Sequence, residues 1–181
     1  MNLLIVYGST EGHTKKIAEF LTNEAEQNGH TVTVAAASDE CIAPHDFEAV
    51  VIASSIHAGQ YSNEVFDYVI KHSEVLNFIP SAFLSVGLSV TRRDPKALDD
   101  LEETTRFFLH VTKWNPLVTE QVAGALLYTQ YGFVKRMLVR SIMKKAGGDT
   151  DTSRDYEYTN WDNIRLFLHH FIRESEVIGI T

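Results

Sequence analysis

Residues 3–14, LLIVYGSTEGHT, form the stretch that decides the fold. Leu3 to Tyr7 are a short, continuous apolar run with β-branched members that ends at Gly8, which is typical of a strand buried on both faces of a parallel sheet. From Thr14 onward, apolar residues recur at helical spacing until Asn28-Gly29 ends the pattern. The chain therefore opens with a buried strand, a polar loop and an amphipathic helix.

The same alternation of strand and helix continues along the chain. Short apolar runs predict strands at 31–36, 49–53, 82–86 and 122–127, and a short one at 155–158. Helical spacing predicts helices at 63–76, with Ile70 on the apolar face, at 95–111, with Leu98 pointing inward, and at 161–173. This pattern predicts an α/β, doubly wound domain with five parallel strands in the order 2-1-3-4-5, which binds ligands beyond the carboxyl ends of its strands.

Composition agrees with one such domain over residues 1–181. The chain has a single cysteine, Cys41, which excludes an internal disulfide and a cysteine-based zinc site. Its formal charge of -8, from 16 basic and 24 acidic residues, argues against a nucleic-acid partner. The N-terminus shows no signal-peptide pattern, and no apolar run approaches the ~18 residues of a transmembrane helix. We expect a soluble or peripheral protein in a reducing compartment.

The loop between the first strand and the first helix is a candidate phosphate site. Backbone N–H groups and hydroxyls converge there on a helix N-terminus, where an anion is stabilised. The alternative is an ordinary turn capped by Ser9 or Thr10. A Walker A loop and the dinucleotide fingerprint are both excluded, because their glycine and lysine spacing is missing. The candidate residues are Ser9, Thr10, Glu11, Gly12, His13 and Thr14.

This loop resembles the flavodoxin phosphate loop, Ser/Thr-x-Thr-Gly-x-Thr, which wraps the phosphate of FMN. The resemblance implies a flavodoxin-like fold and FMN as the cofactor. The sequence departs from the motif at Glu11, whose carboxylate adds negative charge near a phosphate dianion. Our expectation is that the Glu11 side chain points into solvent and leaves its backbone N–H to the phosphate.

The resemblance also assigns two loops to the flanks of the flavin ring. The second of them lacks an aromatic residue for stacking, so one face of the flavin is expected to be open. His57 and Tyr61 are the nearest rings in the first loop. For His57, contact with the flavin or proton handling and an ordinary loop histidine remain equal alternatives. The candidate residues are Ser54, Ser55, Ile56, His57, Gly59 and Tyr61 in the first loop, and Val86, Gly87 and Leu88 in the second.

Residues 128–153 are an insertion near the fifth strand that the alternating pattern does not require. Five of the chain's 16 basic residues and none of its 24 acidic residues lie between Tyr128 and Gly148, so the rest of the chain carries 11 basic and 24 acidic side chains. On a helical wheel, apolar residues occupy one arc and basic residues the opposite one, with Val139 and Met143 as interruptions. Such a helix suits a membrane surface, and core packing with solvated lysines is the alternative.

The insertion carries a second, more specific resemblance. Tyr128 to Tyr131, Met143 to Thr152 and Tyr158 to Trp161 resemble the quinone-dependent protoporphyrinogen IX dehydrogenases of bacterial haem synthesis, which are flavodoxin-like proteins with such an insertion. The match extends over nearly the whole chain. It implies FMN-dependent oxidation of protoporphyrinogen IX with a membrane quinone as acceptor, in a cytoplasmic protein bound peripherally to the inner membrane through the insertion.

Basic and apolar side chains near the flavin are the candidates for contact with substrate propionates or with lipid head groups. They are Arg92, Arg93, Phe133, Lys135, Arg136, Met137 and Arg140. No residue stands out as a catalytic base, and no pattern identifies an oligomer interface. A flavodoxin-type electron carrier, an NAD(P)H:quinone reductase of the same fold and a flavin-free interaction domain remain alternatives.

Overall fold

Five parallel strands form the central sheet in the computed structural model, which describes residues 1–39, 41–91 and 95–179. The sheet order is β2-β1-β3-β5-β6, and each neighbouring pair is parallel. A short strand, β4, adds to β3 in antiparallel fashion. The predicted order 2-1-3-4-5 is confirmed, because β4 only shifts the numbering. The bounds are β1 (Asn2–Gly8), β2 (Thr31–Ala36), β3 (Ala49–His57), β4 (Gln60–Tyr61), β5 (Ser81–Gly87) and β6 (Val118–Ala123).

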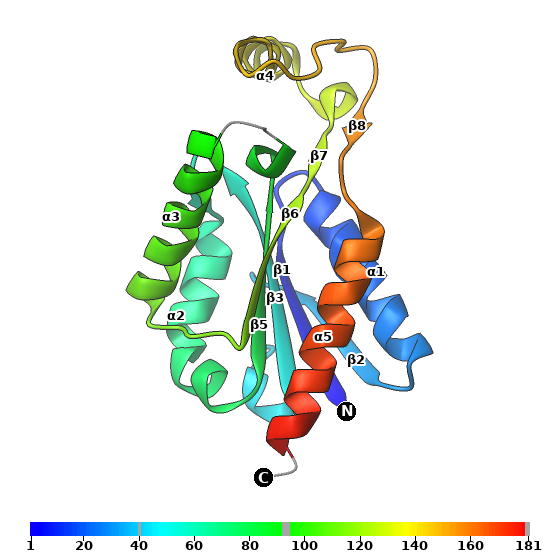
Figure 1. Cartoon of the computed structure of the whole chain (residues 1–181), viewed down its shortest axis with the longest axis vertical. Helices are drawn as coiled ribbons and strands as arrows, with labels where there is room; N and C mark the ends of the chain where they lie inside the picture. The colour runs from blue at the N-terminus through cyan, green and yellow to red at the C-terminus, as the bar shows by residue number, and fades with distance from the viewer. Residues whose placement is uncertain (40, 92–94, 180–181) are drawn as a thin grey trace.

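Helices cover both faces of this sheet (Figure 1). On one face lie α1 (His13–Gln27) and α5 (Trp161–Gly179), and on the other α2 (Asn63–Phe78) and α3 (Pro95–Thr112). Leu3 and Ile5 of β1 pack into the core on the α1 side, and Leu4 and Val6 into the core on the α2 side. The continuous apolar run at the start of the chain is therefore explained by burial on two faces.

The prediction that Ile70 and Leu98 face inward is wrong. Ile70 of α2 is 46% exposed and Leu98 of α3 is 41% exposed. Each lies beside the apolar stripe that its helix buries. Val69 of α2 and Leu101 of α3 lie within that stripe and are buried. A helix that packs on one sheet face buries only a narrow stripe, so residues next to that stripe face solvent.

The prediction of the fifth strand at 122–127 is also wrong in its bounds. The sheet strand β6 spans Val118–Ala123 and includes the exposed residues Thr119 and Glu120, so its sequence lacks a clear apolar pattern. The chain then leaves the sheet at Gly124. A separate antiparallel ladder follows, in which β7 (Ala125–Leu126) pairs with β8 (Tyr156–Glu157). The apolar run at 122–127 thus belongs to two different units.

The ladder of β7 and β8 carries the insertion beyond the carboxyl ends of the sheet strands (Figure 1). The insertion contains a 3-10 turn, η3 (Tyr128–Gln130), and the helix α4 (Phe133–Lys145). It has a small core of its own, formed by Leu126, Tyr128, Tyr131 and Met143. Two further 3-10 turns, η1 (Pro44–Asp46) and η2 (Leu88–Thr91), lie outside it. Among the described helices, none has the length and apolar character to cross a bilayer.

Candidate functional site

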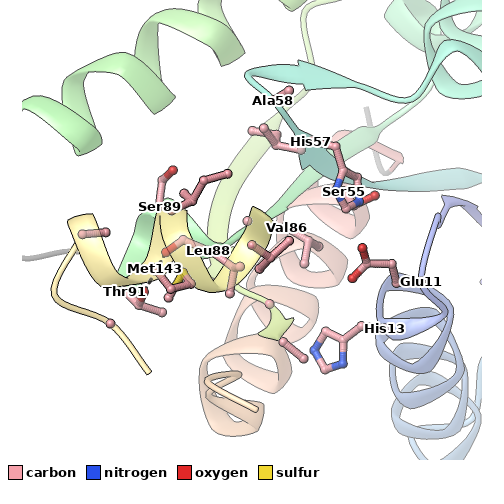
Figure 2. A pocket seen from close by; sticks show the side chains of 18 of the residues that line it. Glu11, His13, Ser55, His57, Ala58, Val86, Leu88, Ser89, Thr91 and Met143 are labelled. Atoms are coloured by element: carbon pink, nitrogen blue, oxygen red, sulfur yellow. Dashed lines mark hydrogen bonds between the residues drawn. The ribbon is translucent and has the colours of Figure 1, made fainter. Parts of the chain in front are cut away.

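A cavity of about 620 Å³ lies between the carboxyl ends of the sheet strands and the insertion. In Figure 2, Glu11 and His13 line one side of it and Leu88, Ser89 and Met143 the other. Its volume lies within the ~300–1,000 Å³ that is usual for small-molecule sites. The topology places it where doubly wound folds bind ligands. Eleven predicted cofactor residues line it: Ser9, Glu11, His13, Thr14, Ser55, Ile56, His57, Gly59, Val86, Gly87 and Leu88.

The candidate phosphate loop is a tight turn that leads into α1. Gly12 takes a left-handed backbone with φ 85°, and its N–H donates to Ser9 Oγ at 3.0 Å. The first turn of α1 contains no acidic residue. An anion at this end of the cavity would meet the helix dipole and the first amides of α1. Gly12 shapes the loop, but neither Thr10 nor Gly12 is among the residues that line the cavity.

Glu11 does not point into solvent, which corrects the expectation from the sequence. Its carboxylate accepts hydrogen bonds from the Tyr131 hydroxyl and from Lys135 Nζ, each at 2.6 Å. The side chain is only 14% exposed. Lys135 also lies over the Tyr131 ring, 4.7 Å from its centroid. The charge that departs from the flavodoxin motif is thus compensated by the insertion, 120 residues further along the chain.

His13 is a buried titratable group of the cavity. Its Nε2 lies 2.6 Å from Thr159 Oγ1, and Thr159 in turn donates to the Ala123 carbonyl at 2.8 Å. This network assigns the proton of neutral His13 to Nε2. Burial lowers the pKa of His13, an effect opposed by the carboxylate of Glu157. The imidazole is therefore favoured in its neutral form at neutral pH.

Tyr61 and Ser54 do not reach the cavity. The Tyr61 hydroxyl donates to Ser85 Oγ at 2.9 Å and bonds Thr105 Oγ1 at 2.8 Å, and its ring packs 5.0 Å from that of Phe83. Ser54 is fully buried within β3. Both residues belong to the sheet and its core. Neither is among the residues that line the cavity, because Ser54 precedes the stretch from Ser55 to His57 that reaches it and the Tyr61 ring packs into the core against Phe83.

The first flanking loop turns through Ala58 and Gly59, which both have positive φ, 51° and 78°. This tight turn joins β3 to β4 and brings Ser55, Ile56 and His57 to the cavity. His57 is exposed at the rim. Its role as a proton-handling residue stays a prediction.

The helix α4 covers the side of the cavity at the second flanking loop, where the sequence predicted an open face. Val139, Ile142 and Met143 of α4 line it, and Met143 is the one buried side chain of that helix. On the helical wheel, Val139 and Met143 interrupt the basic arc. They form the inward face, while Phe133 and Val134 on the apolar arc are 78% and 80% exposed.

The predicted contact residues of the insertion have different environments. Lys135 lines the cavity, whereas Phe133, Met137 and Arg140 lie on the exposed surface of α4. Arg136 is half-buried, and its Nη2 donates to the Tyr131 carbonyl at 2.9 Å. Arg92 and Arg93 lie outside the described residues.

The comparisons with known proteins agree with this architecture. The family model described as flavodoxin domain matches residues 4–153. The chain belongs to the flavodoxin domain family. Among solved members of that fold, flavodoxin 1 from Bacillus cereus superposes with a TM-score of 0.55 at 13% identity and covers 96% of this chain and 98% of its own.

Two curated relatives of this flavodoxin-domain protein are much closer in sequence. A Leishmania major protein is 36% identical over 172 residues, which are 93% of this chain and 73% of that protein. An Escherichia coli protein is 35% identical over 168 residues, which are 92% of each chain. Both are named protoporphyrinogen IX dehydrogenase (quinone).

Among the residues of this flavodoxin-domain site that sequence reasoning missed are Tyr131, Val139, Met143 and Thr159. Val139 and Met143 carried a signal, because they broke an otherwise regular amphipathic arc. Tyr131 and Thr159 lie in stretches that carry the family resemblance, but no local pattern indicates what they contact, since their partners Glu11 and His13 lie far away in the chain.

Proposed function

We propose that this protein binds FMN in the cavity and oxidises protoporphyrinogen IX to protoporphyrin IX, with a membrane quinone as electron acceptor. The observation that carries the proposal is the relationship to the Escherichia coli protein of that name, which extends over 92% of both chains. The cavity at the carboxyl ends of the strands supplies a site for the flavin.

The residues of the cavity fit FMN. Ser9, Thr14 and the N-terminus of α1 provide donors for a phosphate at one end. Gly59, Gly87 and Gly124 line the cavity without side chains, which leaves room for a flat ring. A Cβ atom built at Gly59 would have no neighbour within 4 Å. One built at Gly87 would make only an ordinary contact, 3.8 Å from Ile56 Cβ.

FMN, when bound, supplies the redox chemistry, taking electron pairs from the substrate and giving them to the quinone. The residues of this chain hold FMN in position, exclude water from its ring and set the charge around it. Val86, Leu88 and Met143 form an apolar wall that excludes water from the ring. Neutral His13, fixed through Thr159, presents a polar ring beside the phosphate loop.

The surface of α4 supports the proposed encounter with an apolar quinone and an anionic substrate. Phe133, Val134 and Leu138 are 78%, 80% and 60% exposed, and Arg140 is exposed on the same helix. Apolar side chains flanked by basic ones suit a bilayer surface with acidic head groups. We therefore extend the proposal to peripheral binding at the cytoplasmic face of the inner membrane.

The decisive experiment uses the purified protein under anaerobic conditions. We expect a flavin spectrum that is bleached by protoporphyrinogen IX and restored by a quinone. Bleaching by NAD(P)H with no response to the porphyrinogen would favour a reductase instead. A protein that takes up no flavin would refute the proposal.

Membrane binding is tested separately by sedimentation with anionic and neutral vesicles. Replacing Leu138 by Ser is expected to weaken sedimentation with anionic vesicles. The matched control is Leu166→Ser, whose side chain is similarly exposed at 64% but belongs to α5, a helix that packs on the sheet and is not part of the insertion. Equal sedimentation of the two variants would contradict a membrane role for α4.

A further inference from the structure

The contact between Glu11 and the insertion is the feature that the proposed function does not explain. It joins the candidate phosphate loop to η3 and α4 by two hydrogen bonds of 2.6 Å, from Tyr131 and Lys135. The loop would bind a dianion more simply without a carboxylate. The carboxylate therefore serves the insertion and not the anion.

The insertion is weakly attached to the body along α4. Met143 is the one buried residue of this helix, while Phe133, Val134 and Leu138 remain well exposed. Burial of apolar surface therefore contributes little to holding α4 over the cavity. A polar contact at the N-terminal end of α4 can then decide whether the helix stays in place.

The base of the insertion is secured independently of Glu11. The strands β7 and β8 pair there, and Tyr128 donates to the Asp149 carbonyl at 2.8 Å. Tyr158 donates to the Asp149 carboxylate at 2.5 Å. The insertion can thus keep its fold at the base while its contact with the phosphate loop breaks.

We propose that Glu11, Tyr131 and Lys135 form a latch that holds the insertion closed over the flavin cavity, so that its opening controls release of the cofactor. The inference rests on the proposed flavin site. Glu11 is in this view a positioning residue, whose partner is the insertion and not the cofactor. Arg136 supports the latch, because its bond to the Tyr131 carbonyl fixes the turn that presents the Tyr131 hydroxyl.

The latch makes a prediction about Glu11→Gln that opposes simple electrostatics. Removing a negative charge beside the phosphate would relieve Coulomb repulsion and by that effect alone slow FMN release. Loss of the latch would speed it instead. We expect release to accelerate about tenfold in Glu11→Gln and about threefold in Lys135→Met, given the modest strength of partly exposed ion pairs and hydrogen bonds.

The experiment measures the FMN dissociation rate by trapping released flavin with an excess of an unrelated apoflavodoxin. Lys144→Met is the matched control, since Lys144 is an exposed lysine on the same helix with no bond to Glu11. The double variant Glu11→Gln/Lys135→Met should release FMN no faster than Glu11→Gln, because the contact between Glu11 and Lys135 is already lost in the single variant. Slower release from Glu11→Gln, or equal effects of Lys135→Met and Lys144→Met, would overturn the latch.

A second measurement does not depend on the cofactor. Hydrogen exchange of residues 133–145 in the flavin-free protein should speed up in Glu11→Gln and Tyr131→Phe, while that of the β7–β8 base stays unchanged. Unaltered exchange in α4 would refute the latch. If the protein bound no FMN, the proposed function would fail while this measurement still tested the latch.

Discussion

Gly8, the last residue of β1, is placed where any side chain would collide with the start of α2. A Cβ built at this position meets Ser62 Oγ and Val65 Cγ2 well inside contact distance. Ser62 is the N-cap of α2, and its Oγ accepts a hydrogen bond from the Val65 N–H at 3.3 Å. Gly8→Ala therefore affects both the packing of two elements and a helix cap, immediately before the candidate phosphate loop.

The size of the effect follows from these contacts. Overpacking a core costs about 1–3 kcal/mol, and a displaced Ser62 gives up a cap that contributes about 1 kcal/mol. Lower entropy of the unfolded chain returns roughly 0.5 kcal/mol when alanine replaces glycine. We expect Gly8→Ala to lower the free energy of unfolding by about 2–3 kcal/mol.

Urea unfolding of the flavin-free protein measures this change as a shift in midpoint at constant slope. Gly87→Ala is the matched control, because Gly87 ends β5 as Gly8 ends β1 and its Cβ would make only an ordinary contact with Ile56. Ser62→Gly in the Gly8→Ala background removes the Oγ atom that the new Cβ meets, and should recover part of the loss. A Gly8→Ala protein within about 0.5 kcal/mol of the parent would refute the reasoning.

Three further predictions concern burial. Burial lowers the pKa of His13 below its ordinary value near 6.5, so the unfolded chain binds more protons than the folded one and stability should fall as the pH drops through 6.5. In thermal unfolding, His13→Gln should therefore lose less stability between pH 7 and pH 5 than the parent protein. Tyr61→Phe should cost about 1–3 kcal/mol in urea unfolding by leaving buried hydroxyls without a partner, and an altered FMN affinity would contradict its place in the core. Phe171→Ala, at a fully buried position, should destabilise by about 3–5 kcal/mol, and a loss under 1 kcal/mol would contradict its packing.

The local sequence pattern was enough to predict the order of the strands in the sheet and the position of the candidate site. The buried run of β1, the loop with Ser9 and the start of α1 are decided by residues close in sequence, so their periodicity and turn chemistry are visible in the chain itself. The parallel topology then brings the carboxyl ends of β1, β3 and β5 together, and with them the residues expected at the cavity.

The amino-acid sequence by itself therefore determined the fold, the position of the candidate phosphate loop and the presence of a basic, apolar insertion. The tertiary structure alone decided what Glu11 contacts, on which side of the sheet Tyr61 lies, and which face of α4 turns inward. The physical reason is distance along the chain: a carboxylate finds its compensating charge 124 residues away in Lys135, and no local periodicity records a partner that only folding brings near.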